Sequence, residues 1–356
     1  MKVLFLTRYG PLGASSRMRV LQFISRFEEA GIDCVVSPLI DDIQLRTRYR
    51  DSRYRSAGLL HSYWARIGQL LCGKQFDLVW IEKEALPWLP AAVETALLLN
   101  VPYVLDFDDA TFHNYDLHAS ALVRRFFGKR IDRLMRRARL VVAGNSYLAQ
   151  RAIDSGAPWV EVVPTVVDLD RYSVKQVKSP REGASRIVWI GSPSTVPYLH
   201  VLREPLAILS ERFSIGLRVI GGDGIQFPGV DIEFVKWSEH TEAESIRACD
   251  IGVMPLFDSP WERGKCGYKL IQYMACGLPV VASGVGVNRE IVRVGENGFV
   301  ADTSEAWVDS LGRLLGDAAL RLRMGSAGRQ RVEEEYCVQR VAPKLVALLR
   351  SAAERV

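Results

Sequence analysis

The hydrophobic positions of this chain fall into short, almost uninterrupted apolar runs that alternate with longer segments of mixed polarity. Runs of Val, Ile and Leu are typical of strands buried on both faces of a parallel sheet, and the mixed segments are typical of the helices that cover such a sheet. Twelve runs of this kind cover residues 2–7, 33–39, 76–82, 102–107, 140–144, 160–165, 186–191, 217–222, 230–237, 250–255, 278–283 and 298–301. A polar segment at 168–185 separates the first six from the last six and predicts a linker. The pattern therefore predicts an α/β protein with two doubly wound domains.

Two helical patterns in the first half carry many basic residues. A helix is predicted over residues 16–30, and a strongly basic one over 121–140, where eight basic residues are opposed by Asp132 alone. The apolar face of the basic helix is predicted to contain Leu122, Val123, Phe126, Phe127, Ile131, Leu134, Met135 and Ala138. Further arginines gather at positions 46, 48, 50, 53, 55 and 66. These charges either form an ordinary solvated surface or meet an anionic membrane, to which each nearby Lys or Arg adds roughly 1 kcal/mol of binding.

Composition narrows the class of protein. Of the 356 residues, 48% are hydrophobic and 24% are charged, and the net charge is only +5, which fits a soluble globular protein without a nucleic-acid partner. The six cysteines include no CxxC pair, so we expect reduced thiols and neither disulfides nor a zinc site. The start, MKVLFLTRYG, is predicted to be a strand and not a signal peptide, and no apolar run approaches the roughly 20 residues that span a bilayer. We therefore expect a cytoplasmic location.

The densest candidate site lies at 261–283, WERGKCGYKLIQYMACGLPVVAS. A helix is predicted over Tyr268–Ala275, because Gly and Pro follow it. Its first turn would expose unpaired backbone N–H groups beside Lys265 and Lys269, and Gly267 would let a ligand approach the backbone closely. Together these groups predict a site for an anion such as a diphosphate, and the alternative is a solvated helix start with ordinary surface lysines.

Residues 268–300 resemble the donor-binding motif of the retaining glycosyltransferases of GT-B fold, family 4 (group 1). In that family a helix rich in EAMACG precedes a PVVAS strand, and G-G-x-x-E-I-V-x-x-G-x-x-G follows. The matching residues here are Met274, Ala275, Cys276, Gly277, Pro279, Val280, Val281, Ala282, Ser283, Gly286, Glu290, Ile291, Val292, Gly295 and Gly298. Further family segments match in order at 10–23, 162–172, 187–195 and 248–256, so the resemblance covers nearly the whole chain.

The resemblance implies two Rossmann-like domains facing across a cleft: an acceptor-binding domain at 1–165 and a nucleotide-sugar-binding domain at 166–340, with a helix at 341–356 that packs back on the first domain. It also implies transfer of a sugar, with retention of configuration and without a metal cofactor, to a glycan, lipid-linked or other hydroxyl acceptor in bacterial cell-surface polysaccharide or glycoconjugate synthesis. The expected donor-binding residues are Gly13, Gly191, Ser192, Ser194, Thr195, Trp237, Lys265, Cys266, Gly267, Tyr268, Lys269, Gln272 and Glu290. The expected acceptor-binding residues are Ser16, Arg17, Arg19 and His113, and the expected catalytic residues are Asp108, Asp109 and Lys265.

The sequence departs from the family at three places. Gly264 and Gln272 stand where the family has two glutamates, although an amide can still bond ribose hydroxyls. The loop 192–195, SPST, replaces an Arg and a Lys that hold the diphosphate, and we infer that Lys265 and Lys269 supply the missing charge. A segment with three aspartates replaces a His that often lies near the reacting sugar.

Those aspartates, Asp106, Asp108 and Asp109, end a predicted strand, where α/β sheets bind ligands. A carboxylate there would orient a sugar hydroxyl or accept the acceptor's proton, and the alternatives are a helix cap or a metal site.

Three smaller features remain, and two of them have two interpretations each. Ser15 and Ser16 are predicted to cap the following helix. Arg17 and Arg19 either meet an anionic acceptor or are solvated, and Trp237 either stacks on the nucleotide base or packs in the core.

Two other functions remain open. A nucleotide-sugar 2-epimerase has the same fold, and the missing glutamate at Gly264 also permits a non-catalytic nucleotide-binding or scaffold protein.

Overall fold

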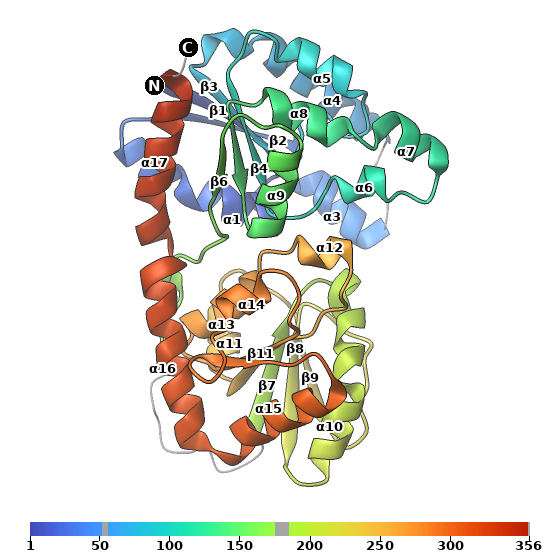
Figure 1. Cartoon of the computed structure of the whole chain (residues 1–356), viewed down its shortest axis with the longest axis vertical. Coiled ribbons are helices and arrows are strands. Elements are labelled where there is room, and N and C mark those ends of the chain that lie inside the picture. The colour runs from blue at the N-terminus through green and yellow to red at the C-terminus, as the bar shows by residue number, and fades with distance from the viewer. Residues whose placement is uncertain (52–55, 175–184, 355–356) are drawn as a thin grey trace. The chain divides into compact units, whose positions relative to one another are not determined.

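The computed structural model describes residues 1–51, 56–174 and 185–354 (Figure 1). The arginines at 53 and 55, and residues 175–184 of the predicted linker, lie outside these ranges. By residue contacts the chain divides into two compact units. The first contains Met1–Thr165, Gly264–Cys266 and Val341–Val356, and the second contains Val166–Arg263 and Gly267–Arg340.

Each unit is built on a six-stranded sheet whose neighbouring strands are parallel. The strands of the first sheet are β1 (Lys2–Tyr9), β2 (Asp33–Ile40), β3 (Leu78–Glu82), β4 (Tyr103–Phe107), β5 (Leu140–Ala143) and β6 (Val160–Val162), in the order β2-β1-β3-β4-β5-β6. Those of the second are β7 (Ser185–Ile190), β8 (Ile215–Ile220), β9 (Asp231–Val235), β10 (Ile251–Met254), β11 (Val280–Ala282) and β12 (Gly298–Val300), in the order β12-β11-β10-β7-β8-β9. All twelve predicted strands are confirmed, with small differences at their ends.

Helices cover these sheets. The first unit has α1 (Ala14–Arg19), α2 (Ile24–Glu29), α3 (Asp42–Asp51), α4 (Ser56–Leu71), α5 (Ala91–Leu97), α6 (His113–Asp116), α7 (Ala121–Phe127), α8 (Arg130–Arg137) and α9 (Ser146–Asp154). Later in the chain come α10 (Arg203–Ser210), α11 (Glu242–Arg247), α12 (Pro260–Arg263), α13 (Tyr268–Ala275), α14 (Asn288–Ile291), α15 (Ser304–Gly316), α16 (Ala318–Glu335) and α17 (Val338–Glu354). Short 3₁₀ segments lie at Leu21–Phe23, Gly73–Gln75, Leu169–Arg171 and Pro193–Leu202.

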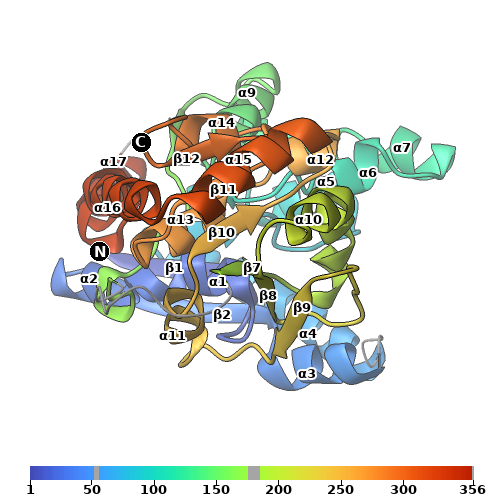
Figure 2. The same ribbon diagram turned by 90° about the horizontal axis from the view of Figure 1, so that it is seen from below.

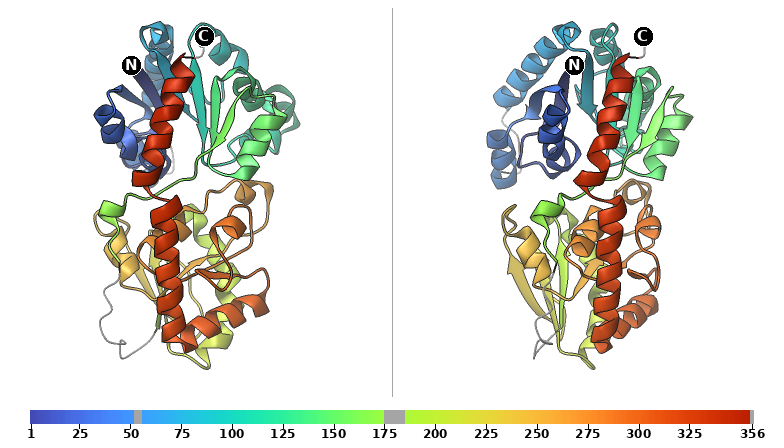
Figure 3. Two further views of the ribbon diagram at one scale, coloured as in Figure 1. Left: turned by 60° about the vertical axis from the view of Figure 1, so that its left-hand side comes forward. Right: turned by 90° about the vertical axis from the view of Figure 1, so that its left-hand side faces the viewer.

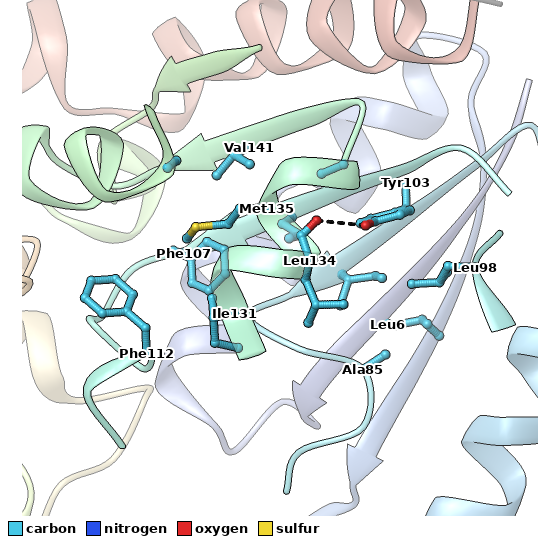
Figure 4. Packing of buried hydrophobic residues seen from close by; sticks show 14 of the residues in the cluster. Leu6, Ala85, Leu98, Tyr103, Phe107, Phe112, Ile131, Leu134, Met135 and Val141 are labelled. Carbon is cyan, nitrogen blue, oxygen red and sulfur yellow. Dashed lines mark hydrogen bonds between the residues drawn. The ribbon is translucent and has the colours of Figure 1, made fainter. Parts of the chain in front are cut away.

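The central strands of each sheet are buried on both faces, which explains their continuous apolar sequence. In the first unit α8 packs Leu134 and Met135 onto the sheet, and the Tyr103 hydroxyl donates to the Leu134 carbonyl at 2.8 Å (Figure 4). Residues of α17 complete the first unit, since Lys344 Nζ donates to Val162 O at 3.1 Å and Arg350 donates to Ala30 O at 2.7 Å (Figure 3). The helix α17 is therefore hydrogen-bonded to the end of β6 and to the residue that follows α2.

Two predicted helices are broken in the structure. The helix predicted over 16–30 is divided into α1 and α2 by the 3₁₀ segment Leu21–Phe23. The basic helix predicted over 121–140 is divided into α7 and α8 at Gly128 and Lys129. Its predicted apolar face is wrong for Leu122 and Phe126, which are exposed, because α7 contributes only Val123 and Phe127 to the core.

The strand order marks where each sheet is expected to bind ligands. In doubly wound sheets, ligands bind beyond the carboxyl ends of the strands where the strand order reverses. That position lies between β1 and β3 in the first sheet and between β7 and β10 in the second. The residues that follow these strands are therefore candidates for ligand binding.

Candidate functional site

Four carboxylates gather at the carboxyl ends of β3 and β4 in the first unit. We call Glu82, Asp106, Asp108 and Asp109 the carboxylate cluster. Glu82 is fully buried and accepts hydrogen bonds from Ser15 Oγ at 2.7 Å, from Ser16 Oγ at 2.5 Å and from the Arg8 N–H at 2.9 Å. The prediction that the two serines cap a helix is wrong: the cap residue of α1 is Gly13, without a side-chain bond, because the hydroxyls are directed to this buried carboxylate instead. Ser16 is itself completely buried.

Asp106 forms a buried ion pair with Arg19. The guanidinium donates twice to the carboxylate, at 2.5 and 3.0 Å, and once to Val163 O at 2.8 Å. Burial raises the pKa of Asp106 to about 6, although Arg19 opposes that rise. Arg19 is therefore not the solvated arginine that one interpretation expected, and its guanidinium joins the ends of β4 and β6.

Lys83 links the two remaining carboxylates. Its Nζ lies 2.9 Å from Asp108 Oδ1 and 3.7 Å from Asp109 Oδ2, and its backbone has a φ of 64°, which is uncommon for a side chain of this size. Burial opposes ionisation of Asp108, but the Lys83 ammonium and the Ser15 hydroxyl outweigh it and lower the pKa of Asp108. At Asp109 burial prevails and the pKa is raised, despite Lys83 and Lys265.

Asp109 is the member of the cluster that is most open to a ligand. Its side chain is 32% exposed, against 12% for Asp108. A partly exposed carboxylate with a raised pKa, held beside an ammonium group, suits proton transfer or the binding of a hydroxyl group.

The segment Gly264–Cys266 belongs to the first unit and lies against the same cluster. Lys265 Nζ is 4.0 Å from Asp109 Oδ1, and the Cys266 thiol donates to Asp108 O at 3.0 Å. Burial raises the pKa of the Cys266 thiol, so it is an unreactive packing group. A Cβ at position 264 would lie 2.5 Å from Ala110 Cβ and 2.8 Å from Ala110 N, so the structure has no room here for the glutamate that the resemblance led us to expect.

Other residues expected to bind the acceptor already have partners. Arg17 is buried and donates to Pro11 O at 2.9 Å. Both ring nitrogens of His113 are engaged, one with Asp116 Oδ1 at 2.7 Å and the other with the Tyr147 hydroxyl at 2.8 Å. A ligand would have to displace these existing bonds to reach either side chain.

In the second unit, a polar turn follows β7 at the reversal of strand order. Gly191 leaves no room for a Cβ, which would lie 2.4 Å from the Trp189 ring. Ser192 and Thr195 cap each other: the Ser192 N–H donates to Thr195 Oγ1 at 3.1 Å, and Thr195 Oγ1 donates to Ser192 O at 2.9 Å. Ser192 Oγ and Ser194 Oγ lie 2.9 Å apart on the surface. The turn presents hydroxyl groups to solvent at a ligand-binding position.

The start of α13 lies in the same unit and has the expected bounds, Tyr268–Ala275. Gly267 has a φ of 63°, and a Cβ there would lie 2.3 Å from Ile291 Cδ1, so both backbone conformation and packing require glycine. Lys269 Nζ lies 4.3 Å from the centre of the Trp189 ring. The buried Asn288 Oδ1 has no hydrogen-bond partner in the described part of the chain and lies 3.3 Å from where that Cβ would be. Lys269 thus lies in the first turn of α13, and the Asn288 oxygen beside Gly267 is a hydrogen-bond acceptor, which suits a hydroxyl group and not a phosphate oxygen.

A buried hydrogen-bonded chain runs from Gln272 to Trp237. Gln272 Nε2 donates to the Tyr172 hydroxyl at 2.8 Å, which donates to Glu242 Oε1 at 2.8 Å, and Trp237 Nε1 donates to Glu242 Oε2 at 2.7 Å. Gln272 is only 3% exposed, so the structure places its amide inside the unit. Trp237 is half-buried, and Glu242 also borders a cavity of about 360 Å³. Glu290, by contrast, is exposed on α14.

Sequence reasoning missed two central members of the first unit's site, Glu82 and Lys83. The signal in the sequence was the string IEKE, which places charged residues at the end of an apolar run that predicts a buried strand. The structure then places this strand, β3, at the reversal of strand order.

Metal ligation was an alternative for the aspartates. Within residues 1–51, 56–174 and 185–354, no group of three or more His, Cys, Asp or Glu side chains has an arrangement that could hold a metal ion. The aspartates face cationic side chains instead: Arg19 for Asp106, Lys83 for Asp108, and Lys83 with Lys265 for Asp109.

Comparison with known proteins identifies the family. A model described as a glycosyl transferase 4-like domain matches residues 9–165, and one described as glycosyl transferases group 1 matches residues 184–317. The D-inositol 3-phosphate glycosyltransferase of Corynebacterium urealyticum is 29% identical over 232 residues, which are 57% of this chain and 53% of that protein. The match thus spans about half the length of this curated relative.

Solved structures agree on the fold. HepE from Anabaena, in complex with UDP-glucose, has a TM-score of 0.72 at 18% identity and covers 99% of this chain and 100% of its own. A sucrose-phosphate synthase from Thermosynechococcus elongatus has a TM-score of 0.71 at 16% identity and covers 99% of this chain and 98% of its own. Family models that match both halves of the chain, together with these neighbours, show that it belongs to the glycosyl transferases of group 1 and has their GT-B fold.

Proposed function

We propose that the protein is a retaining glycosyltransferase that moves a sugar from a nucleotide-sugar donor to a hydroxyl group of a glycan or lipid-linked acceptor. The observation that carries this proposal is the start of α13, where left-handed Gly267 precedes the helix and Lys269 lies in its first turn. The HepE structure was determined with UDP-glucose, which supports a nucleotide-sugar as the donor. Synthesis of a bacterial cell-surface polysaccharide or glycoconjugate is the setting that we propose.

The second unit would bind the donor. Departure of the nucleotide leaves negative charge on its diphosphate, and fixed positive groups lower the barrier when they are aimed at that charge in advance. The first amides of α13, the Lys269 ammonium and the hydroxyls of the turn at 192–195 are the groups that this unit offers. Lys265 remains a predicted contributor.

The first unit would bind the acceptor. Asp109 would accept the proton of the attacking hydroxyl, while Lys83 holds the carboxylate in place and Lys265 lies nearby. The raised pKa of Asp109 makes it a better proton acceptor than an ordinary aspartate.

The test is direct. The purified protein is screened by thermal shift against nucleoside diphosphates and their sugars, and the stabilising donor is then incubated with and without candidate glycans. A ligand at 100 times its dissociation constant should stabilise the protein by about 2.7 kcal/mol. Sugar transfer with retained configuration supports the proposal. Conversion of the donor without an acceptor would indicate a 2-epimerase, and binding without turnover a scaffold protein.

Lys269→Met is expected to weaken binding of a nucleoside diphosphate by roughly 10- to 150-fold, because a charge-assisted contact contributes about 1.5–3 kcal/mol. Binding of the corresponding nucleoside should change little, since it lacks the phosphates. Calorimetric titration of both ligands measures the difference. The same change at exposed Lys236 is the matched control, and Lys265→Met tests the second lysine in the same way. An equal loss of affinity for both ligands would show that Lys269 does not contact the diphosphate.

Sugar transfer is expected to persist in EDTA, because the proposed mechanism uses amides and ammonium groups to stabilise the leaving diphosphate. The measurement is the initial rate of transfer before and after chelation, with manganese and magnesium added back. Complete loss on chelation and recovery with either ion would assign Asp106, Asp108 and Asp109 to metal binding.

A further inference from the structure

The helix α7 presents an apolar surface that the first unit does not cover. None of its seven residues is buried, and Leu122 and Phe126 are 68% and 70% exposed. They lie one helical turn apart, so their side chains share a face, while Val123 and Phe127 pack toward the core. Leu117, just before α7, is 56% exposed. Figures 1 and 2 show α7 projecting from the rest of its unit.

Basic side chains flank this apolar surface. Arg125 and Lys129 are exposed, and Arg124 is exposed as well but also donates to His118 O and Ala119 O in the turn before the helix. The stretch 117–131 contains no acidic residue. The acidic residues on either side of it, Asp116 and Asp132, both pair with Arg151, at 3.0 and 2.8 Å. The stretch that contains α7 therefore carries basic residues without an acidic neighbour in the sequence.

The structure also shows which of the predicted basic residues are exposed next to Leu122 and Phe126. Arg130 was one of the basic residues predicted for this surface, but it is 1% exposed and pairs with Glu84 and Glu94 inside the unit. The basic residues that are available next to Leu122 and Phe126 are Arg124, Arg125 and Lys129.

We propose that α7 docks the protein on anionic lipid bilayers, with Leu122 and Phe126 inserted at the level of the headgroups and Arg125 and Lys129 against lipid phosphates. An exposed aromatic and aliphatic pair with exposed Arg125 and Lys129 beside it complements a lipid surface, whose phosphates are negative and whose interior is apolar. In the described ranges, no helix combines the length and apolarity that crossing a bilayer requires, so this contact would be peripheral. The inference does not depend on the proposed reaction.

The experiment is co-sedimentation of the full chain with vesicles of mixed phosphatidylglycerol and phosphatidylcholine, and with vesicles of phosphatidylcholine alone, at low and high salt. Binding is expected only to the anionic vesicles, and it should weaken at high salt because exposed charges are screened. Arg125→Gln with Lys129→Gln should reduce the partition coefficient roughly 25-fold, about fivefold for each charge. Leu122→Ala with Phe126→Ala should reduce it roughly tenfold or more.

Matched controls come from the same unit. Leu99 is 70% exposed and Arg137 is exposed, so Leu99→Ala with Arg137→Gln removes the same kinds of side chain away from α7 and should leave binding unchanged. Thermal unfolding checks that every variant is folded, and nucleoside diphosphate binding checks the proposed donor site separately. Wild-type protein that ignores anionic vesicles at low salt would overturn the proposal. Variants of α7 that bind anionic vesicles as well as the wild type does would also overturn it. The same holds if sedimentation velocity shows that the protein is a dimer and that the α7 variants abolish this dimer.

Discussion

Asp109→Asn is expected to lower kcat for sugar transfer by roughly 10²- to 10⁴-fold, while the dissociation constant of the donor changes little. Asparagine keeps the size of the side chain but cannot accept a proton or pair with Lys83, whose Nζ lies 3.7 Å away. Steady-state kinetics and calorimetric donor titration separate the two effects. Asp154→Asn, on the exposed end of α9, is the matched control and should retain full activity.

The ionisation of Asp109 should also determine how kcat/KM depends on pH. Because burial raises the pKa of Asp109, protonation should remove activity as the pH falls through a value above the ordinary aspartate pKa of 3.8. In Asp109→Asn this acid limb should disappear from kcat/KM. An unchanged acid limb, or a kcat within threefold of the wild type, would exclude Asp109 as the proton acceptor.

Arg130→Met is expected to lower the free energy of unfolding by about 3–5 kcal/mol, because it removes the buried cation that pairs with Glu94 and leaves Glu84 with the more distant Arg8, at 3.7 Å. The guanidinium lies 2.6 Å from Glu84 and 2.5 Å from Glu94, and it also donates to Leu86 O and Leu89 O at 2.6 Å each. Burial raises the pKa of Glu84 even with Arg130 in place, so that carboxylate is costly to leave unpaired. Chemical denaturation measures the change.

Arg133→Met is the matched control for this prediction, since Arg133 lies on the same helix and is exposed. Its effect should stay within about 0.5 kcal/mol. If Arg130→Met and Arg133→Met had the same free energy of unfolding, the charge of Arg130 would make no net contribution to stability. Adding Glu94→Gln to Arg130→Met should recover part of the loss, because the buried carboxylate that lost its ion-pair partner is then uncharged.

The strands and α13 could be predicted because their signals are local. Uninterrupted apolar runs identify buried strands wherever they occur, and a glycine before and after 268–275 defines the ends of α13. Both Gly267 and Gly277 have a positive φ, so each position requires the backbone conformation that glycine adopts most easily.

The details of the carboxylate cluster could not be predicted, because they depend on pairs of residues distant in sequence. Arg19 meets Asp106 across 87 positions, and Ser16 meets Glu82 across 66. Nothing in a single sequence distinguishes a buried arginine with such a partner from a solvated one. The same reason explains why Arg130 was grouped with the surface charges of α7.

The first unit consists of pieces from both halves of the gene product, since Val341–Val356 belongs with Met1–Thr165. Leu345, Leu349 and Ala352 of α17 are buried, so the surface that they cover is apolar until they arrive. On the ribosome, domains usually fold in the order in which they are made. Here the unit whose synthesis starts first is the last to be finished. A nascent chain ending at residue 340 contains every residue of the second unit, while the first unit still lacks most of α17 and exposes the surface that this helix covers. Exposed apolar surface of this kind is what makes partly folded chains prone to aggregate.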